Sequence, residues 1–168
     1  MTDTPETSNW ALNAQVFLGR IHAIDPSGRR RALYPSLFTD AEGASIGGQS
    51  DWLVAGNEHP ACVMRFLLHS TTPNRLNFMI MGNAEHQDKK LGVSRNGYLG
   101  FYRYASVVDY FKLEPLQWGQ DSLLCRWRDH LGHQVKARSE APEASARFSY
   151  MNVQMGNPLT FLVERIAQ

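Results

Sequence analysis

Cysteine is scarce in this sequence, because only Cys62 and Cys125 occur among its 168 residues. Neither belongs to a CxxC pair or to a Cys/His spacing of the kind that holds structural zinc. Both lie among apolar residues, in "ACVMRFLL" and "SLLCRWR", so we interpret them as buried free thiols of a protein in a reducing compartment. The alternative is a single disulfide, which requires that their Cα atoms approach within about 7 Å.

An excess of charge of either sign is also missing. Lys and Arg together number 17 and Asp and Glu number 16, which gives a formal net charge of +1. Polyanions attract proteins with a broad basic surface, so we expect no nucleic-acid partner. The densest positive cluster is Arg29, Arg30 and Arg31, just after a DPSG turn. We interpret these arginines as the solvated edge of a strand, because edge charges prevent pairing with other chains.

Long hydrophobic runs are absent as well. The run at 78–81 and its neighbours falls far short of the ~20 apolar residues that a membrane-spanning helix requires. The first ten residues, "MTDTPETSNW", lack the basic start and the apolar core of a secretory signal. We therefore expect no membrane span, a disordered lead-in at residues 1–10, and a cytoplasmic location, with signal-free release as the alternative.

Motifs for catalysis or metal binding are missing too. There is no GxSxG elbow, and apolar surroundings raise rather than lower the pKa of a cysteine thiol. The stretch "GGQSDW" at 47–52 has neither the lysine nor the following helix of a phosphate loop. "RDHLGH" places His130 and His133 beside Asp129, but zinc requires three or four convergent ligands, so we interpret both histidines as surface turn residues. We expect no catalytic residue, metal or cofactor, although carboxylates paired only in space would leave no motif.

What the sequence does contain is a succession of short strands. No segment of twelve or more residues keeps the apolar spacing of an amphipathic helix with caps at both ends. Apolar or alternating runs of four to nine residues recur instead, and Gly, Pro, Asn or Asp interrupts them. This pattern predicts a single all-β domain, at residues 11–168, of the barrel or sandwich type.

The clearest hairpin lies around Asn96 and Gly97, between "LGVSR" and "YLGFYR". A two-residue type I′ turn needs positive φ at both central positions, which Asn tolerates and Gly adopts freely. In the following stretch "YFKLEPL", Phe111 and Leu113 can share one face of a strand, and the strand breaks at Pro115.

A phenylalanine followed two residues later by an aliphatic residue closes three successive blocks of the sequence. These phenylalanines are Phe66, Phe111 and Phe161, which lie 45 and 50 residues apart. A period of this size is a sign of an internal repeat. The blocks align as three repeats of four strands each, at about 11–71, 72–117 and 118–168, which makes twelve strands in all.

Twelve strands in three four-stranded units are the pattern of a β-trefoil. The stretch "KKLGVSRNGYLGFYR…YFKLEPL" resembles the repeat of β-trefoil proteins, especially the fascin-like and lectin-like branches, in which such a hairpin precedes a strand with a core phenylalanine. The QxW signature of ricin-type lectins is absent, because Gln117 lies directly beside Trp118 in "LQWG"; this argues against a ricin-type galactose site. Another β-barrel or a β-sandwich is the alternative fold.

The middle block is rich in aromatic and polar side chains. Tyr98, Tyr102 and Tyr104 can lie on one face of their strand. Sugars are held by an aromatic ring stacked on their C–H face and by Asp, Asn or Gln bonded to hydroxyls, and the resemblance to trefoil lectins implies shallow sites of this type on the outer face. The candidate ligand-binding residues are Tyr102, Tyr104, Asp109, Trp118 and Gln120. The alternative is that the tyrosines pack the barrel or its cap.

Two classes of function follow from this resemblance. The first is a non-enzymatic, lectin-like module that recognises a glycan. The second is a protein-interaction trefoil, such as a protease inhibitor or a cytoskeleton-binding module, which would use loops on a rigid barrel; the longer loops are expected at 39–50 and 140–146. A toxin component or a small hydrolase is a lesser alternative.

Overall fold

The computed structural model describes residues 10–11, 15–35, 52–57, 59–83, 89–102, 110–138 and 148–166. Apart from a short helical stretch at Trp10 and Ala11, the regular structure of these residues is strand, so the expected all-β class is confirmed. The strands are β1 (Val16–Ile24), β2 (Arg30–Pro35), β3 (Leu53–Gly56), β4 (Met64–Thr72), β5 (Arg75–Met81), β6 (Lys90–Val93), β7 (Leu99–Tyr102), β8 (Phe111–Trp118), β9 (Ser122–Arg128), β10 (Lys136–Arg138), β11 (Phe148–Asn152), β12 (Asn157–Pro158) and β13 (Thr160–Arg165). This part of the chain contains no helix with the length and apolarity that crossing a membrane requires.

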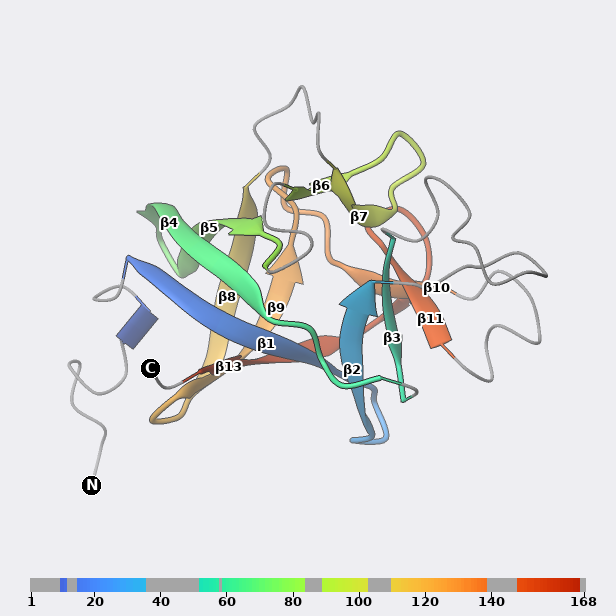
Figure 1. Cartoon of the computed structure of the whole chain (residues 1–168), viewed down its shortest axis with the longest axis horizontal. Coiled ribbons are helices and arrows are strands. Elements are labelled where there is room, and N and C mark those ends of the chain that lie inside the picture. The colour runs from blue at the N-terminus through green and yellow to red at the C-terminus, as the bar shows by residue number, and fades with distance from the viewer. Residues whose placement is uncertain are drawn as a thin grey trace.

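Six of the strands form a closed barrel (Figure 1). Each pairs antiparallel with two others, in the order β1, β4, β5, β8, β9, β13 and back to β1. Closure leaves no unpaired strand edge around the barrel. The pairing of β1 with β13 places Ile21 opposite Val163, so segments from the two ends of the chain meet in the barrel wall.

Six further strands form three antiparallel hairpins: β2 with β3, β6 with β7, and β10 with β11. In Figure 1 these hairpins lie above and to the right of the barrel. They also contact one another, because β3 pairs with β11 and single bridges join Trp52 to Gly100 and Tyr98 to Asn152. The short strand β12 pairs with β10.

The hairpin predicted around Asn96 and Gly97 is the β6–β7 hairpin, but its turn is not of type I′. Only Gly97 has a positive φ, of 87°, and the turn closes with the Gly97 N–H donating to the Ser94 carbonyl at 2.9 Å. Groups at the end of β11 and just after it hold this wider turn, because the Asn152 amide donates to the Asn96 carbonyl at 3.1 Å and the Val153 N–H donates to the Gly97 carbonyl at 2.9 Å. The expected type I′ turn is therefore wrong, and contacts distant in sequence select the observed one.

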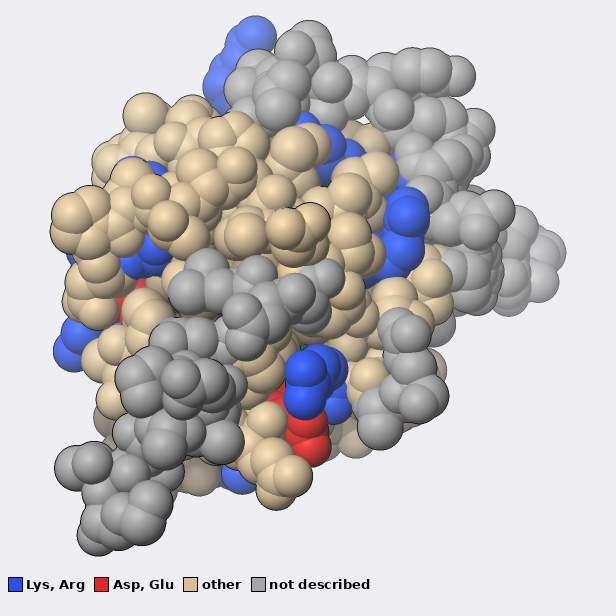
Figure 2. Space-filling view, turned by 90° about the vertical axis from the view of Figure 1, so that its left-hand side faces the viewer, with Lys and Arg blue, Asp and Glu red and all other residues tan. Residues whose placement is uncertain are grey.

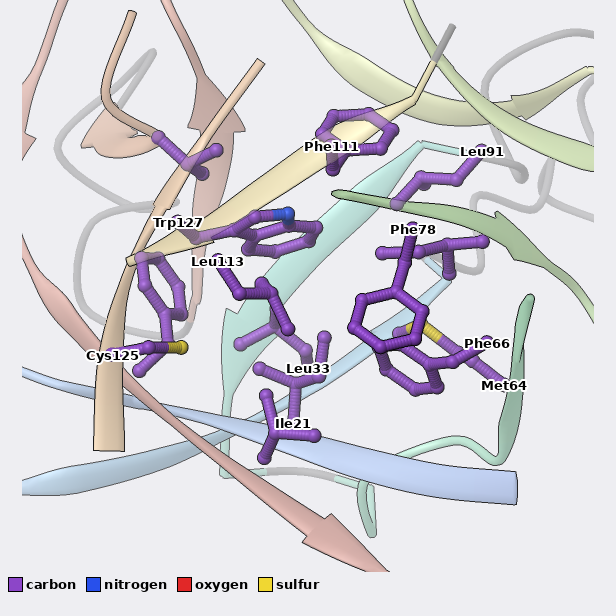
Figure 3. Close-up of a cluster of buried hydrophobic side chains, with 14 of the residues drawn as sticks. Ile21, Leu33, Met64, Phe66, Phe78, Leu91, Phe111, Leu113, Cys125 and Trp127 are labelled. Carbon is purple, nitrogen blue, oxygen red and sulfur yellow. The ribbon is translucent and has the colours of Figure 1, made fainter. Parts of the chain in front are cut away.

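Aromatic side chains fill the barrel. The phenylalanines that mark the sequence period, Phe66, Phe111 and Phe161, are each fully buried and come from β4, β8 and β13. Trp127 packs between two of them, with ring centroids 5.6 Å from Phe111 and 5.2 Å from Phe161. Figure 3 shows Trp127 on one side of this core and Phe66 with Phe78 on the other. The three phenylalanines of the sequence period therefore lie at buried positions in three different barrel strands.

Trp10 belongs to this packed structure. Its ring lies edge-on to Phe17 at 5.0 Å and to Trp118 at 5.8 Å, and its side chain is buried. The indole N–H donates to the Ser122 carbonyl at 3.3 Å. Trp10 was expected at the end of a disordered lead-in; the other residues of that segment, 1–9, lie outside the described residues.

Both cysteines are free thiols, as expected. Cys125 lies in β9 and is completely buried, and burial raises the pKa of its thiol. Burial also raises the pKa of Cys62 to about 12. Neither thiol is therefore ionised near neutral pH, so neither has the low pKa of a catalytic cysteine.

Candidate functional site

The described residues among those predicted to bind a ligand lie in two different parts of the structure. Tyr102 ends β7, where it pairs with Lys90 of β6. The strand β8 continues through Pro115, where a break was expected, and Trp118 is its last residue. Gln120 is exposed in the turn that follows. Tyr104 and Asp109 lie outside the described residues.

The structure does not bring Tyr102 and Trp118 together. The strand β8 from Phe111 to Trp118 spans roughly 23 Å at about 3.3 Å per residue. In Figure 1 the β6–β7 hairpin lies near the start of β8, at the top, whereas the β8–β9 turn lies at the bottom. Tyr102 and the Trp118–Gln120 segment are therefore at opposite ends of the barrel.

Tyr98 has a packing role in the hairpins. Its ring stacks on Trp52 with centroids 4.9 Å apart and meets Tyr150 edge-on at 5.7 Å. All three belong to a second apolar cluster, and Tyr98 is only 8% exposed. For this tyrosine, the alternative that the aromatic residues pack the cap is the one the structure supports.

A pocket lies away from these residues, at the turn between β9 and β10. We call residues 128–134 the histidine turn, because it carries the "RDHLGH" motif. The turn, together with Val93, Lys136, Val153 and Gln154, lines an open pocket with a volume of about 910 Å³. Pockets of this size accommodate small organic ligands.

Asp129 determines the shape of the histidine turn. Its side chain is only 5% exposed. Its Oδ1 accepts from the backbone N–H of Leu131 at 3.0 Å and from that of His133 at 2.8 Å. An Asp side chain that accepts from N–H groups two or more residues later is the usual means of fixing a polar turn. The motif therefore contains a structural aspartate.

The second oxygen of Asp129 positions His133. Asp129 Oδ2 lies 3.1 Å from His133 Nδ1, while the His133 side chain is 60% exposed. The contact with Asp129 thereby fixes the orientation of an exposed ring. Such an Asp–His pair activates a nucleophile in hydrolases, but the pocket lining includes no Ser, Thr or Cys. The pair therefore holds an exposed imidazole in one position at the pocket.

The histidines do not form a metal centre with other ligands in the described part of the chain, where no group of three or more His, Cys, Asp and Glu converges. His130 instead lies beside an aromatic group, with its ring 6.0 Å from the Tyr110 ring. Tyr110 in turn stacks on His69 at 4.4 Å. Both pocket histidines are thus held by specific neighbours, Tyr110 for His130 and Asp129 for His133.

The two positively charged side chains of the pocket, Arg128 and Lys136, differ in whether they already have bonding partners within the protein. Arg128 donates to Glu114 Oε1 at 3.0 Å and to the Gly132 carbonyl at 2.9 Å. Lys136 pairs with no carboxylate among the residues that the structure describes. A ligand would therefore meet Lys136 as an available positive charge beside the exposed ring of His133.

Elsewhere among the described residues, acidic side chains lie close to basic ones. On the face shown in Figure 2, the visible acidic side chains lie beside Lys or Arg. Glu114 is the clearest ion-pair centre, with Arg128 at 2.9 Å, Arg75 at 3.2 Å and Arg126 at 3.8 Å. Partial burial opposes ionisation of Glu114, but the hydrogen bond from Arg128 and the three positive charges outweigh it and lower the pKa of this carboxyl.

Sequence reasoning found the histidine turn but missed the residues that complete the pocket. Lys136 begins a strand of only three residues, and Gln154 follows β11 in a segment remote from the turn. Neither carries a motif, and only the pairing of β10 with β11 brings them to the same place. Comparisons with protein-family models, with curated proteins and with solved structures found no significant match for this chain.

Proposed function

We propose that this protein is a non-enzymatic binding module whose pocket at the histidine turn holds an acidic glycan, a ligand rich in hydroxyls that carries a negative charge. The observation that carries this proposal is the composition of the pocket, where His133, Gln134, Lys136 and Gln154 converge on one open space. Amide and imidazole groups bond to sugar hydroxyls, and an ammonium group pairs with a carboxylate or sulfate.

Preorganisation of the pocket supports binding. Asp129 and Arg128 fix the histidine turn through bonds to its backbone. The Gln154 amide donates to the Arg95 carbonyl at 3.1 Å, which leaves its oxygen available as an acceptor. Polar groups that are already held in place lose little side-chain entropy when a ligand binds.

The arrangement of strands supports a β-trefoil as the fold of this module. The six-stranded barrel and the three hairpins alternate along the chain: β1 and β4 flank the β2–β3 hairpin, β5 and β8 flank β6–β7, and β9 and β13 flank β10–β11. The strand β12 is an addition to that pattern. We also propose the cytoplasm as the location, and the two free thiols favour such a reducing compartment.

A glycan array tests the proposed function. The purified protein is screened together with Lys136→Ala, which alters the pocket, and Gln120→Ala, which alters the exposed turn predicted from the sequence. We expect binding to sialylated, uronic or sulfated glycans that Lys136→Ala weakens about tenfold, the effect of losing ~1.4 kcal/mol of binding free energy. Gln120→Ala should bind as the unaltered protein does. The opposite pattern would place the site beside Trp118, and a blank array would reject glycan recognition.

A protein partner is the second candidate, because large apolar side chains are exposed beside the same pocket. Leu131 is 69% exposed within the histidine turn, and Met155, next to Gln154, is 58% exposed. Apolar anchors surrounded by polar groups are typical of protein interfaces. The loops at 39–50 and 140–146, expected to serve an inhibitor, lie outside the described residues. Met155→Ala removes an exposed apolar side chain that does not line the pocket, so it should weaken capture of such a partner while leaving glycan binding intact.

A further inference from the structure

A second, smaller pocket opens between the β1–β2 hairpin and the strands β3, β10, β11 and β12. Its volume is about 350 Å³. Alanines at three positions, Ala23, Ala55 and Ala137, form its walls together with prolines and Leu159, while Arg31 and Ser149 supply polar groups. The pocket combines an apolar enclosure with one positive charge.

Arg31 occupies a core-facing position. It pairs with Ala23 across the β1–β2 ladder, and Leu33, two residues further along β2, pairs with Ala55. Residues two apart in a strand share a face. Ala23, Leu33 and Ala55 all belong to the barrel's apolar core, so the Arg31 side chain lies on the face that contributes to this core.

The interpretation of the three arginines as a solvated edge therefore fails at one position. Arg29 and Arg30 are exposed, whereas Arg31 is half-buried. Arg30 and Arg31 point to opposite faces of the strand, and of the two only Arg31 lines the pocket. A core-facing arginine is costly unless its charge is compensated.

The compensation in the described structure is incomplete. Arg31 Nη1 donates to Ser149 Oγ at 3.2 Å, a neutral partner. No carboxylate within the described ranges lies at ion-pairing distance from this guanidinium. Partial burial lowers the pKa of Arg31 from its usual value, but a guanidinium keeps its charge at any physiological pH.

The one acidic residue in the pocket lining, Asp25, is engaged by its own turn. Its Oδ1 accepts from the Ser27 hydroxyl at 2.6 Å and from the backbone N–H groups of Ser27 and Arg29 at 3.0 and 2.9 Å. Its Oδ2 lies 3.5 Å from Arg29 Nε. Asp25 is thus held by its own turn and by Arg29. Its charge acts on Arg31 without a direct ion pair, so the guanidinium keeps donors for a ligand.

We propose that this pocket binds a small organic carboxylate, with the carboxylate paired to the Arg31 guanidinium and the apolar body of the ligand among the alanines. A guanidinium presents several donors in one plane and can hold both oxygens of a carboxylate. Alanine at three inward positions leaves room that larger side chains would fill. The site is separate from the histidine turn and shares no lining residue with it.

Benzoate is a suitable probe, because it joins a carboxylate to an apolar ring. Titration of the isotope-labelled protein, followed by backbone amide NMR, should shift the resonances of β2, β3 and β11 saturably. Benzamide, the uncharged analogue, and inorganic phosphate, which lacks an apolar body, should each bind at least about tenfold more weakly, since a charge-assisted bond contributes roughly 1.5–3 kcal/mol. Phosphate that binds as tightly as benzoate would overturn the assignment to a carboxylate.

Two arginine variants distinguish benzoate binding in this pocket from non-specific attraction by positive charge. Arg31→Gln removes the proposed partner, and Arg30→Gln removes an equal charge from the opposite face of the same strand. We expect Arg31→Gln to weaken benzoate binding about tenfold or more and Arg30→Gln to leave it within about twofold. Equal losses in both would show non-specific attraction. A saturable shift that is absent from β2 and β11 in the unaltered protein would overturn the proposal outright.

A variant that fills the pocket provides an independent check. Ala55→Leu places a larger side chain into the space while keeping Arg31, so benzoate binding should disappear. Since a larger residue at a core position can prevent folding, Ala137→Val, at a partly exposed position, is the companion variant. Amide dispersion in the NMR spectrum establishes that each variant is folded. Unchanged benzoate affinity in a folded variant of either kind would refute the proposed location.

Discussion

Asp129 has two roles, one structural and one in the proposed site. One oxygen accepts from two backbone N–H groups of the histidine turn, and the other lies 3.1 Å from the ring of His133. A buried donor that loses its acceptor carries the full cost of its desolvation. The turn and the orientation of the exposed imidazole therefore depend on the same carboxylate.

Two substitutions of Asp129 distinguish these roles. Asp129→Ala removes the acceptor of both N–H groups, and we expect the free energy of unfolding to fall by about 1–3 kcal/mol. Asp129→Asn retains an oxygen at the same place and should lose less than half as much. Urea denaturation, monitored by tryptophan fluorescence, measures both values. Equal losses would mean that the charge, rather than the backbone hydrogen bonds, holds the turn.

Glycine is required at position 156 by its surroundings as well as by its backbone. Gly156 has a φ of 136°, and a Cβ there would overlap the backbone oxygen of Ala137 and lie 2.8 Å from its carbonyl carbon. Gly28 also has a positive φ, of 89°, but a Cβ at that position meets no atom within 4 Å. Substitutions at the two positions can therefore distinguish the cost of backbone strain from the cost of steric overlap.

Alanine at each of these glycines should have unequal effects. Gly28→Ala should lower the free energy of unfolding by about 1–2 kcal/mol, the cost of a left-handed conformation for a residue with a Cβ. Gly156→Ala should cost about 1–3 kcal/mol more, because the β10–β12 contact must move apart. Thermal unfolding followed by circular dichroism gives the comparison. A loss at Gly156 no larger than the loss at Gly28 would contradict the predicted overlap.

At the scale of elements, β5, β8 and β9 are joined across their outer face by the ion pairs of Glu114. The side chain of Glu114 is 13% exposed and lies within 4 Å of arginines from both neighbouring strands. Each arginine alone would add little at a solvated surface. A carboxylate shared among three of them is held in one geometry and has a lowered pKa.

Acidification should remove the stabilisation that the Glu114 carboxylate gives to the fold. Because the folded protein holds the Glu114 pKa below its unfolded value, the carboxylate stabilises the fold above the unfolded pKa of about 4.3. That stability is lost as pH falls through the lower folded pKa. We expect Glu114→Gln to be less stable than the unaltered protein at pH 7, by about 1–3 kcal/mol, with the difference shrinking below about pH 4. Urea denaturation across pH 3–7 measures it, and a constant difference would exclude Glu114 as the cause.

The elements that sequence predicts well are those set by local chemistry. The spacing of Phe66, Phe111 and Phe161 corresponds to three buried positions in barrel strands, and the Asn96–Gly97 signal located a hairpin correctly. The turn type was wrong because Asn152 and Val153, more than fifty residues away, bond to that turn. The turn propensity of Asn-Gly depends only on neighbouring residues, so it cannot reflect partners that are distant in sequence.

The same limit applies to the candidate sites. The Asp, Gly and His residues of "RDHLGH" predicted a turn, and the structure contains one there. Lys136 and Gln154 reach that turn only through strand pairing, and Arg31 faces the second pocket while the adjacent Arg30 points to the other side of β2. Which face of a strand is buried depends on register, so a pattern of charge alone could not identify the core-facing arginine.

At the scale of the whole molecule, closure of the barrel makes every strand of the wall depend on two neighbours. The strand β13 lies between β1 and β9 and pairs with no other strand in the part of the chain that the structure describes. Along β13, Phe161 and Val163 face the core while Leu162 lies on the outer wall and is partly exposed. A disruption on the inner face should therefore open the barrel rather than loosen one strand.

A pair of adjacent substitutions tests this dependence. Val163→Asp places a charge in the core and should destabilise the protein by more than about 4 kcal/mol, whereas Leu162→Asp on the outer wall should cost about 1 kcal/mol or less. If closure couples the strands, Val163→Asp removes hydrogen-exchange protection in β5 and β8 together with β13, although β5 and β8 do not pair with it. Protection that survives in β5 and β8 while β13 exchanges would show that the barrel opens locally, and the six strands would then not unfold as one cooperative unit.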